Sequence, residues 1–252
     1  MNKEPMLNQP TLDKLYKLRL SAMADAWQNQ ERDPSAMQLD FDERFAMLVD
    51  AEHLARQNRR LARLLKQATL RIPTATVEDI KTAPGRGLDK AMLRQLASLQ
   101  WVDDSMNVLL SGATGVGKSY LACALGQLAC RRGKRVLYRR VPRLIQEVAL
   151  SKIDSTYPKL LKKLRSADLL ILDDLGLGQL REAARHDLLE IFEDRYDLRA
   201  TVVTSQLPIA KWHDWFGDPT IADAILDRLV HNAYKVTLKG PSRRKTKTSK
   251  TK

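Results

Sequence analysis

The residues with the most evident chemistry in this chain lie between Gly112 and Ser119. Their order, Gly-Ala-Thr-Gly-Val-Gly-Lys-Ser, fits the pattern G-x-x-x-x-G-K-[ST] of a phosphate-binding loop. In such a loop the backbone N–H groups turn toward the phosphates, the lysine reaches the outer phosphates and the hydroxyl ligates magnesium. The sequence therefore predicts a nucleotide site. Its expected contact residues are Gly112, Ala113, Thr114, Gly115, Val116, Gly117, Lys118, Ser119 and Tyr120.

Two carboxylates, Asp173 and Asp174, follow the apolar run 169–172. Such a run is typical of a buried strand, and acids at its end can lie beside a bound triphosphate. We expect Asp173 to hold the magnesium ion. We expect Asp174 to orient or activate the attacking water, because hydrolysis of a phosphate needs positioning more than covalent chemistry. The alternative is a solvated strand end, which the preceding phosphate loop disfavours.

Further polar residues follow the next expected strand and helix. Ser205 or Gln206, which come directly after the apolar run 200–204, are placed to contact the γ-phosphate. Arg228 stands near the end of a helix that Asp218 is expected to cap. Taken alone, an arginine there is a partner for Asp227 or a cation at the helix C-terminus.

The elements that must position these residues alternate along the second half of the chain. Strands are expected at 107–111, 135–139, 168–172 and 200–204, and helices at 118–131, 142–152, 158–164 and 182–197. This alternation predicts an α/β fold with a parallel sheet between helices and the ligand at the carboxyl ends of the strands. Cys123 and Cys130, both on the helix after the phosphate loop, are expected to be small packing residues.

The N-terminal part of the chain is expected to be helical. Thr11 can cap a first helix, whose apolar positions recur at helical spacing up to Trp27. Asp40 and Glu43 form the pattern of a capping box that opens a second, long helix to about Thr69. We expect a helical domain at 1–72, a linker at 73–88, a nucleotide-binding domain at 89–238 and a basic tail at 239–252.

The charge of the chain favours a polyanionic partner. Its 252 residues include 43 Lys and Arg against 30 Asp and Glu, a net charge of +13 that suits nucleic acid. One basic ridge stands at i, i+3, i+4 and i+7 on the long helix, and residues 235–252 contain no acid and are expected to be disordered. The expected DNA contacts are Arg56, Arg59, Arg60, Arg63, Arg243, Arg244, Lys245 and Lys247. The alternatives are a solvated helix face and a solubilising tail.

The sequence contains no pattern typical of base-specific DNA binding, zinc binding, DNA cleavage or membrane insertion. The sequence has no defensible helix-turn-helix pattern, zinc-ligand spacing or carboxylate cluster for two-metal cleavage, so DNA binding is expected to be largely independent of sequence and without strand cutting. No apolar run is long enough to span a membrane, and the first residues lack the apolar core of a signal peptide. We therefore expect a cytoplasmic protein with no membrane partner.

The order of these motifs resembles that of the AAA+ ATPases in the branch of the helicase loader DnaC. The motifs that carry this resemblance are, in order, the phosphate loop, Leu-Asp-Asp at 172–174, Thr-Ser-Gln-Leu-Pro at 204–208 and Ala-Ile-Leu-Asp-Arg-Leu at 224–229. The chain is more closely similar to the IstB-like transposition helper ATPases of bacterial insertion sequences. That similarity extends to residues 18–24, 58–62, 86–89 and 211–213, and so to nearly the whole chain.

The resemblance implies an AAA+ P-loop core that binds ATP and Mg²⁺ and hydrolyses ATP. It implies that Lys118 and Ser119 form Walker A, that Asp173 and Asp174 form Walker B, and that Gln206 with Ser205 forms sensor 1. It also implies that Arg228 is an arginine finger that reaches a neighbour's nucleotide. Copies would then assemble head to tail, as a ring or spiral, on duplex DNA and act on a transposase encoded alongside.

The chain departs from the AAA+ pattern in three places. Asp174 stands where many AAA+ proteins have Glu, the usual helical lid is missing after Arg228, and a sensor 2 arginine would have to be Arg243 or Arg244. Two other functions remain open at this point. One is a DnaC-like replicative helicase loader, and the other is a nucleotide-dependent DNA scaffold that does not hydrolyse ATP.

Overall fold

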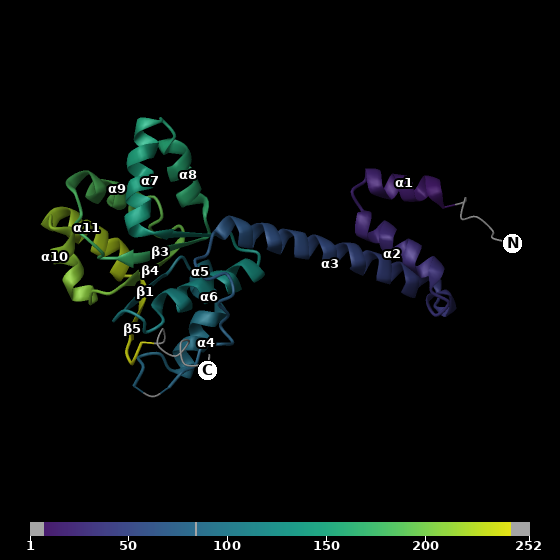
Figure 1. Ribbon diagram of the computed structural model, residues 1–252, viewed down its shortest axis with the longest axis horizontal. Coiled ribbons are helices and arrows are strands. Elements are labelled where there is room, and N and C mark those ends of the chain that lie inside the picture. Colours follow the sequence, from purple (N-terminus) through teal and green to yellow (C-terminus); the bar gives the residue numbers. More distant parts are fainter. Residues whose placement is uncertain (1–7, 84, 243–252) are drawn as a thin grey trace, which may run out of the picture. The chain divides into compact units, whose positions relative to one another are not determined.

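The chain divides into two compact units, Met1–Arg63 and Leu64–Lys252 (Figure 1). The structure is a computed structural model, and it describes residues 8–83 and 85–242. The division falls inside helix α3 (Phe41–Ala68), so this helix contributes to both units. The functional boundaries expected at residues 72 and 88 remain a prediction.

The first unit is helical, but its first helix is broken in two. It contains α1 (Gln9–Lys17), α2 (Ser21–Arg32), the 3-10 turn η1 (Ala36–Gln38) and most of α3. The prediction of one helix through Trp27 is wrong, because Arg19 adopts a left-handed φ of 60° that ends the first segment. Thr11 lies inside α1, whose N-cap is Asn8.

The start of α3 agrees with the capping box expected from the sequence. The Glu43 N–H donates to Asp40 Oδ1 at 2.8 Å, and the Asp40 N–H donates to Glu43 Oε2 at 3.4 Å. These two bonds satisfy backbone donors that would otherwise lack a partner in the first turn of the helix. The long helix at this position is therefore confirmed.

The second unit is built on a five-stranded parallel sheet. Its strands are β1 (Asn107–Gly112), β2 (Val136–Arg140), β3 (Leu169–Leu175), β4 (Ala200–Ser205) and β5 (Ala233–Leu238), in the order β2-β3-β4-β1-β5. The α/β fold class is confirmed. The expectation that disorder begins at Lys235 is wrong, because Lys235 pairs with Leu109 within β5. In this edge strand Val236 and Leu238 are buried while Lys235 and Thr237 are exposed.

Helices cover both faces of the sheet (Figure 1). They are α4 (Lys90–Ser98), α5 (Gln100–Asp103), α6 (Lys118–Arg131), α7 (Val141–Ile153), α8 (Tyr157–Ser166), α9 (Glu182–Glu193), η2 (Ile209–Lys211), α10 (Trp212–Phe216) and α11 (Pro219–Val230). Helix α9 ends at Glu193, before the expected residue 197, and a turn follows in which Asp197 has a left-handed φ of 52°. Across the residues that the structure describes, no helix has the length and apolar character needed to cross a membrane.

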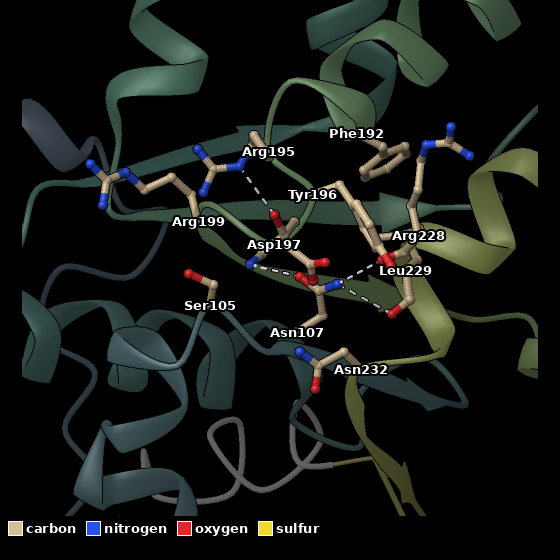
Figure 2. Close-up of a pocket in the computed structure, with 11 residues that line it drawn as sticks. Ser105, Asn107, Phe192, Arg195, Tyr196, Asp197, Arg199, Arg228, Leu229 and Asn232 are labelled. Atoms are coloured by element: carbon tan, nitrogen blue, oxygen red, sulfur yellow. Dashed lines mark hydrogen bonds between the residues drawn. The ribbon is translucent and has the colours of Figure 1, made fainter.

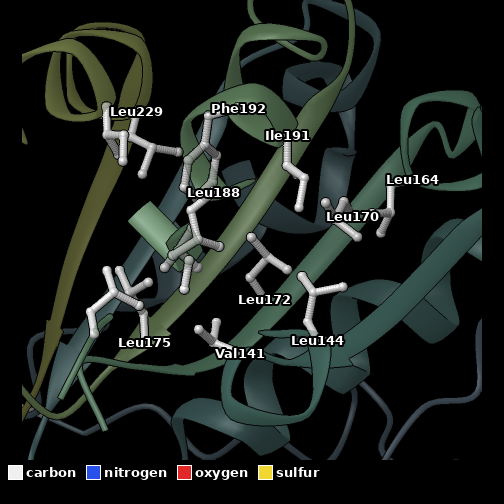
Figure 3. Packing of buried hydrophobic residues seen from close by; sticks show 14 of the residues in the cluster. Val141, Leu144, Leu164, Leu170, Leu172, Leu175, Leu188, Ile191, Phe192 and Leu229 are labelled. Atoms are coloured by element: carbon white, nitrogen blue, oxygen red, sulfur yellow. The ribbon is translucent and has the colours of Figure 1, made fainter. Parts of the chain in front are cut away.

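One face of the sheet packs against α7 to α11 in a large apolar cluster (Figure 3). Leu172 of β3 lies there with Leu144 and Leu188 of the covering helices, and all three side chains are buried. Helix α6 covers the opposite face at close range. A Cβ on Gly126 would come within 2.7 Å of Ile171 Cδ1, so a larger residue there would force this side chain to shift.

The two cysteines belong to the packed side of α6. Cys123 and Cys130 are both buried, as their expected packing role requires. Burial raises the pKa of each thiol to about 11, so both stay protonated and unreactive at neutral pH.

Candidate nucleotide-binding site

The phosphate loop joins the end of β1 to the start of α6. Gly117 is the N-cap of α6 and has a φ of 108°, a left-handed conformation that side chains with a Cβ rarely adopt. Lys118 is only 7% exposed, and its Nζ donates to the carbonyls of Gly112 at 2.7 Å and Ala113 at 2.9 Å. The lysine and the positive end of the α6 dipole thus converge on one spot, which favours an anion.

Ser119 and Asp173 meet at this edge of the sheet although they come from separate elements. Ser119 Oγ on α6 donates to Asp173 Oδ1 on β3 at 2.8 Å. The Asp173 side chain is fully buried. A hydroxyl and a carboxylate are the hard oxygen ligands that Mg²⁺ prefers, so these two residues fit a magnesium ion accompanying a triphosphate.

Asp173 accepts hydrogen bonds from neighbouring strands as well. Tyr138 of β2 donates its hydroxyl to Asp173 Oδ2 at 2.6 Å, and Thr204 of β4 donates its hydroxyl to Oδ1. Burial, together with the bond to Asp173, raises the pKa of the Tyr138 phenol, so this group remains a donor. The sequence analysis did not identify Tyr138, whose position depends on the pairing of β2 with β3.

A break in the strand register brings Asp174 to the same side as Asp173. Consecutive residues of a regular strand point to opposite faces. Asp174 instead has a left-handed φ of 64°, and the pairing of β3 with β4 shifts between Leu172 and Leu175. The Asp174 N–H donates to Thr204 Oγ1 at 3.1 Å, which fixes this bend. Both carboxylates can therefore act on one ligand.

Two arginines that the sequence analysis missed contact the carboxylates. Arg71 Nη1 lies 3.3 Å from Asp173 Oδ2 and 3.6 Å from Asp174 Oδ2. Arg140 Nη2 lies 2.9 Å from Asp174 Oδ2. Arg140 ends β2, directly opposite Asp173 in the register, so a correct strand alignment would have indicated it. No sequence signal marks Arg71, which lies in an irregular segment after α3.

Gln206 and Ser205, the expected sensor residues, have different environments. Thr114 Oγ1 in the phosphate loop donates to Gln206 Oε1 at 2.8 Å, so Gln206 lies beside the loop. Ser205 is fully buried, and its hydroxyl donates to the Leu175 carbonyl at 2.7 Å and accepts the Leu207 N–H at 3.0 Å. The structure thus favours Gln206 for a phosphate contact, whereas Ser205 holds the backbone.

Residues from the expected linker 73–88 adjoin the phosphate loop. Arg86 Nη2 donates to the Val116 carbonyl at 3.0 Å, and the Tyr120 hydroxyl contacts the backbone N–H of Thr76 at 3.4 Å. A small pocket opens here beside the loop. Its lining includes Ile80, Lys81, Arg86, Leu88, Val116, Gly117, Tyr120, Leu121 and Leu238. This segment therefore contributes to the candidate site as well as connecting two parts of the chain.

Arg228 lies beside the start of β1, close to Asn107 (Figure 2), whereas the phosphate loop follows the end of this strand. Asn107, the first residue of β1, donates its side-chain amide to the carbonyls of Arg228 at 3.2 Å and Leu229 at 3.3 Å. The loop follows the other end of β1, roughly 17 Å away at the usual rise per residue of a strand. Arg228 Nη2 pairs with Glu193 at 2.6 Å rather than with Asp227.

The residues expected to bind DNA are only partly described. Arg56 and Arg59 both pair with the buried carboxylate of Glu52, at 2.8 and 2.9 Å. These two guanidinium groups already have an acidic partner, and a DNA contact by the ridge that includes Arg60 and Arg63 remains a prediction. The expected tail contacts Arg243, Arg244, Lys245 and Lys247 lie outside the described residues, as does either candidate for sensor 2.

Comparison with known proteins agrees with this geometry. The family model described as "IstB-like ATP binding protein" matches residues 13–251. The chain belongs to this family. It is 48% identical to the insertion sequence ATP-binding protein y4pL of Sinorhizobium fredii, over 97% of this chain and 100% of that protein. It is 35% identical to the ATP-binding protein of insertion sequence IS21 from Pseudomonas aeruginosa, over 82% of this chain and 78% of that one.

Solved structures with the same fold include proteins of DNA replication. The DnaC helicase loader has a TM-score of 0.56 at 20% identity, over 66% of this chain and 97% of that one. The replication initiator DnaA bound to AMPPCP and single-stranded DNA also has a TM-score of 0.56 at 20% identity, over 72% of this chain and 55% of that one. At this identity the likeness shows the fold alone, which is that of the AAA+ P-loop proteins. As a member of the IstB-like family, the protein binds ATP.

Proposed function

We propose that this IstB-like protein is a magnesium-dependent ATPase that assembles on duplex DNA and regulates a transposase encoded alongside it. The observation that carries the proposal is the arrangement of charged groups on the sheet. Lys118, Asp173 and Asp174 converge at the carboxyl ends of the strands, whereas Arg228 lies at their amino ends. Arg71 and Arg140 are held by the carboxylates of this site, so a neighbouring copy is suited to supply a further arginine, Arg228, to the γ-phosphate.

Each residue around the phosphate loop has a separate role in the proposed hydrolysis. Lys118 binds the outer phosphates, while Ser119 and Asp173 hold magnesium, which would neutralise the charge on the phosphates. Gln206 contacts the γ-phosphate. Asp174 orients the attacking water, and for this its Oδ2 must be released from Arg71 and Arg140. Binding of the charged nucleotide supplies competing partners for those arginines.

The adenine base of ATP lies, in this proposal, in the small pocket beside the phosphate loop. Ile80, Leu88 and Leu238 offer apolar contacts to a planar ring, and Arg86 fixes the adjoining loop through Val116. Ile80, Lys81, Arg86 and Leu88 thus hold the base while the loop holds the phosphates. This arrangement gives the segment a direct role in nucleotide binding.

Assembly follows from the position of Arg228. A finger at the amino ends of the strands and a phosphate site at their carboxyl ends form a heterologous, head-to-tail interface, which generates rings or open spirals. The Arg228–Glu193 pair is partly exposed, with 26% and 50% of the two side chains accessible. Exchange of Glu193 for a neighbour's phosphate therefore requires no unpacking of the core.

Two observations support DNA and a transposase as partners: the charge of the chain and the names of its relatives. The net charge of +13 and the basic residues of the 239–252 segment support sequence-independent contact with phosphates. The relatives are named for insertion sequences, which favours a transposase over a replicative helicase as partner. Removal of residues 239–252 should weaken duplex binding and flatten its salt dependence, and an unchanged affinity and slope would exclude this role for the segment.

The test is ATP turnover measured with and without duplex DNA, over a range of protein concentration. The proposal expects turnover that needs Mg²⁺ and rises in specific activity as the protein assembles. Tight nucleotide-dependent DNA binding without turnover would show a scaffold instead. Capture of a hexameric helicase, but not of the cotranscribed transposase, would show a helicase loader.

A further inference from the structure

Helix α8 of the second unit carries a row of cations that the sequence analysis did not single out. Leu160 and Leu164 bury one side of this helix in the apolar cluster. The opposite side carries only basic and neutral residues. Its exposed cations are Lys159, Lys162, Lys163 and Arg165. Within residues 8–83 and 85–242, no ion pair joins any of these four side chains to an acid.

This arrangement is unfavourable for the isolated helix. Lys159, Lys162 and Lys163 stand at i, i+3 and i+4, where like charges repel each other across one helical turn. The helix dipole disfavours Lys159 in the first turn of α8 and favours Lys163 and Arg165 in the last turn, so the repulsion between the lysines is the main unfavourable contribution. An ordinary solvated face mixes acids with bases and avoids this repulsion. The row therefore fits a surface that an external polyanion neutralises.

A groove beside α8 extends the basic surface. Lys162 and Arg165 line it together with Arg135 and Arg199, and the groove has a volume of about 830 Å³. Arg135 and Arg199 share one acid, Asp168, at 3.1 and 3.8 Å. Asp194 also lines the groove, so four cations face two acids in and beside it. The excess of positive charge continues from the helix into the hollow.

We propose that α8 and this groove bind the sugar-phosphate backbone of duplex DNA. The inference rests on the proposed DNA-binding function and names the surface that performs it. Lysines on neighbouring positions of one helix face act as point charges toward successive phosphates, without reading bases. The arginine ridge of α3 differs, because Arg56 and Arg59 share the carboxylate of Glu52, whereas the three lysines of α8 have no acidic partner among the described residues.

The deciding experiment compares two triple variants of the full chain. One variant carries Lys159→Gln, Lys162→Gln and Lys163→Gln. The matched control loses the same charge elsewhere in the second unit, through changes of three exposed cations away from α8. The control changes are Lys90→Gln, Arg94→Gln and Lys211→Gln. Binding to a short mixed-sequence duplex is measured by fluorescence anisotropy at several salt concentrations, with a non-hydrolysable ATP analogue present.

The α8 variant should lose about tenfold or more in affinity, and its log–log salt slope should fall by about 2 to 3 per bound protomer, as expected for three lost phosphate contacts. The control variant should match the wild type, and both variants should keep their affinity for the ATP analogue. Equal losses in both variants, or an α8 variant that behaves like the wild type, would overturn the assignment to α8. A wild type that does not bind duplex DNA would refute the DNA-binding function itself.

Discussion

Arg228→Ala should abolish hydrolysis while leaving the fold and ATP binding intact. The side chain forms a partly exposed pair with Glu193 and donates to the Ala224 carbonyl at 2.8 Å. Losing an exposed pair of this kind costs about 1 kcal/mol or less in the free energy of unfolding. Losing an arginine finger lowers the rate about 1,000-fold or more, equivalent to about 4 kcal/mol in the activation barrier. The effect on the rate should therefore exceed the effect on stability.

Mixing two inactive variants tests whether Arg228 acts on a neighbour. Arg228→Ala retains an intact phosphate site, and Lys118→Ala retains its arginine. Each alone should lack turnover. In a random mixture of equal parts, about a quarter of the head-to-tail interfaces combine the intact site with the intact finger, so activity should return toward about a quarter of wild type. Turnover of each variant and of the mixture is followed by phosphate release.

Glu193→Gln is the matched control, because it breaks the same ion pair but leaves the arginine in place. This variant should retain wild-type turnover. Equal losses in Glu193→Gln and Arg228→Ala would show that the pair matters only for structure. Full turnover by dilute monomer, or no recovery on mixing, would refute action between copies.

Three further changes probe the carboxylate edge and the core. Asp174→Asn should leave ATP affinity nearly unchanged and remove hydrolysis, and wild-type phosphate release would refute the assigned role. Arg71→Ala removes a cation that shares its carboxylates with magnesium, so the Mg²⁺ concentration for half-maximal turnover should fall roughly fivefold, equivalent to about 1 kcal/mol, while Arg71→Lys should not change it. Arg195→Met deprives the carbonyls of Leu164, Ala167 and Ala200 of their donor, and should lower the free energy of unfolding in urea by about 3 kcal/mol. An unchanged urea midpoint would contradict the last prediction.

Buried Arg195 shows how a residue can be invisible to motif analysis and still organise the fold. The residue is 2% exposed, and its guanidinium is bonded to backbone carbonyls rather than to a carboxylate. Burial lowers its pKa to about 9, which still leaves it charged at neutral pH. A lone arginine in a sequence carries no sign of this environment, because the acceptors come from α8, β4 and the chain between α8 and β3.

The sequence indicated those features that depend on neighbouring residues along the chain. The phosphate loop, with Lys118 and Ser119, follows from a strand, a glycine turn and a helix in succession. The capping box at Asp40 and the alternation of strands and helices are local in the same sense. Strand β5 escaped prediction, because Lys235 and Lys239 resemble the start of the basic tail and only the pairing with β1 makes this segment a strand.

Tertiary structure alone decided which charged groups face each other. Arg71 and Asp173 are far apart in the sequence, and only the folding of the segment after α3 onto the sheet brings them into contact. The separation of Arg228 from the phosphate loop depends on the strand order β2-β3-β4-β1-β5 and on the docking of α11 at the start of β1. Local patterns reflect backbone periodicity over a few residues, whereas these placements depend on long-range packing that no short stretch of sequence specifies.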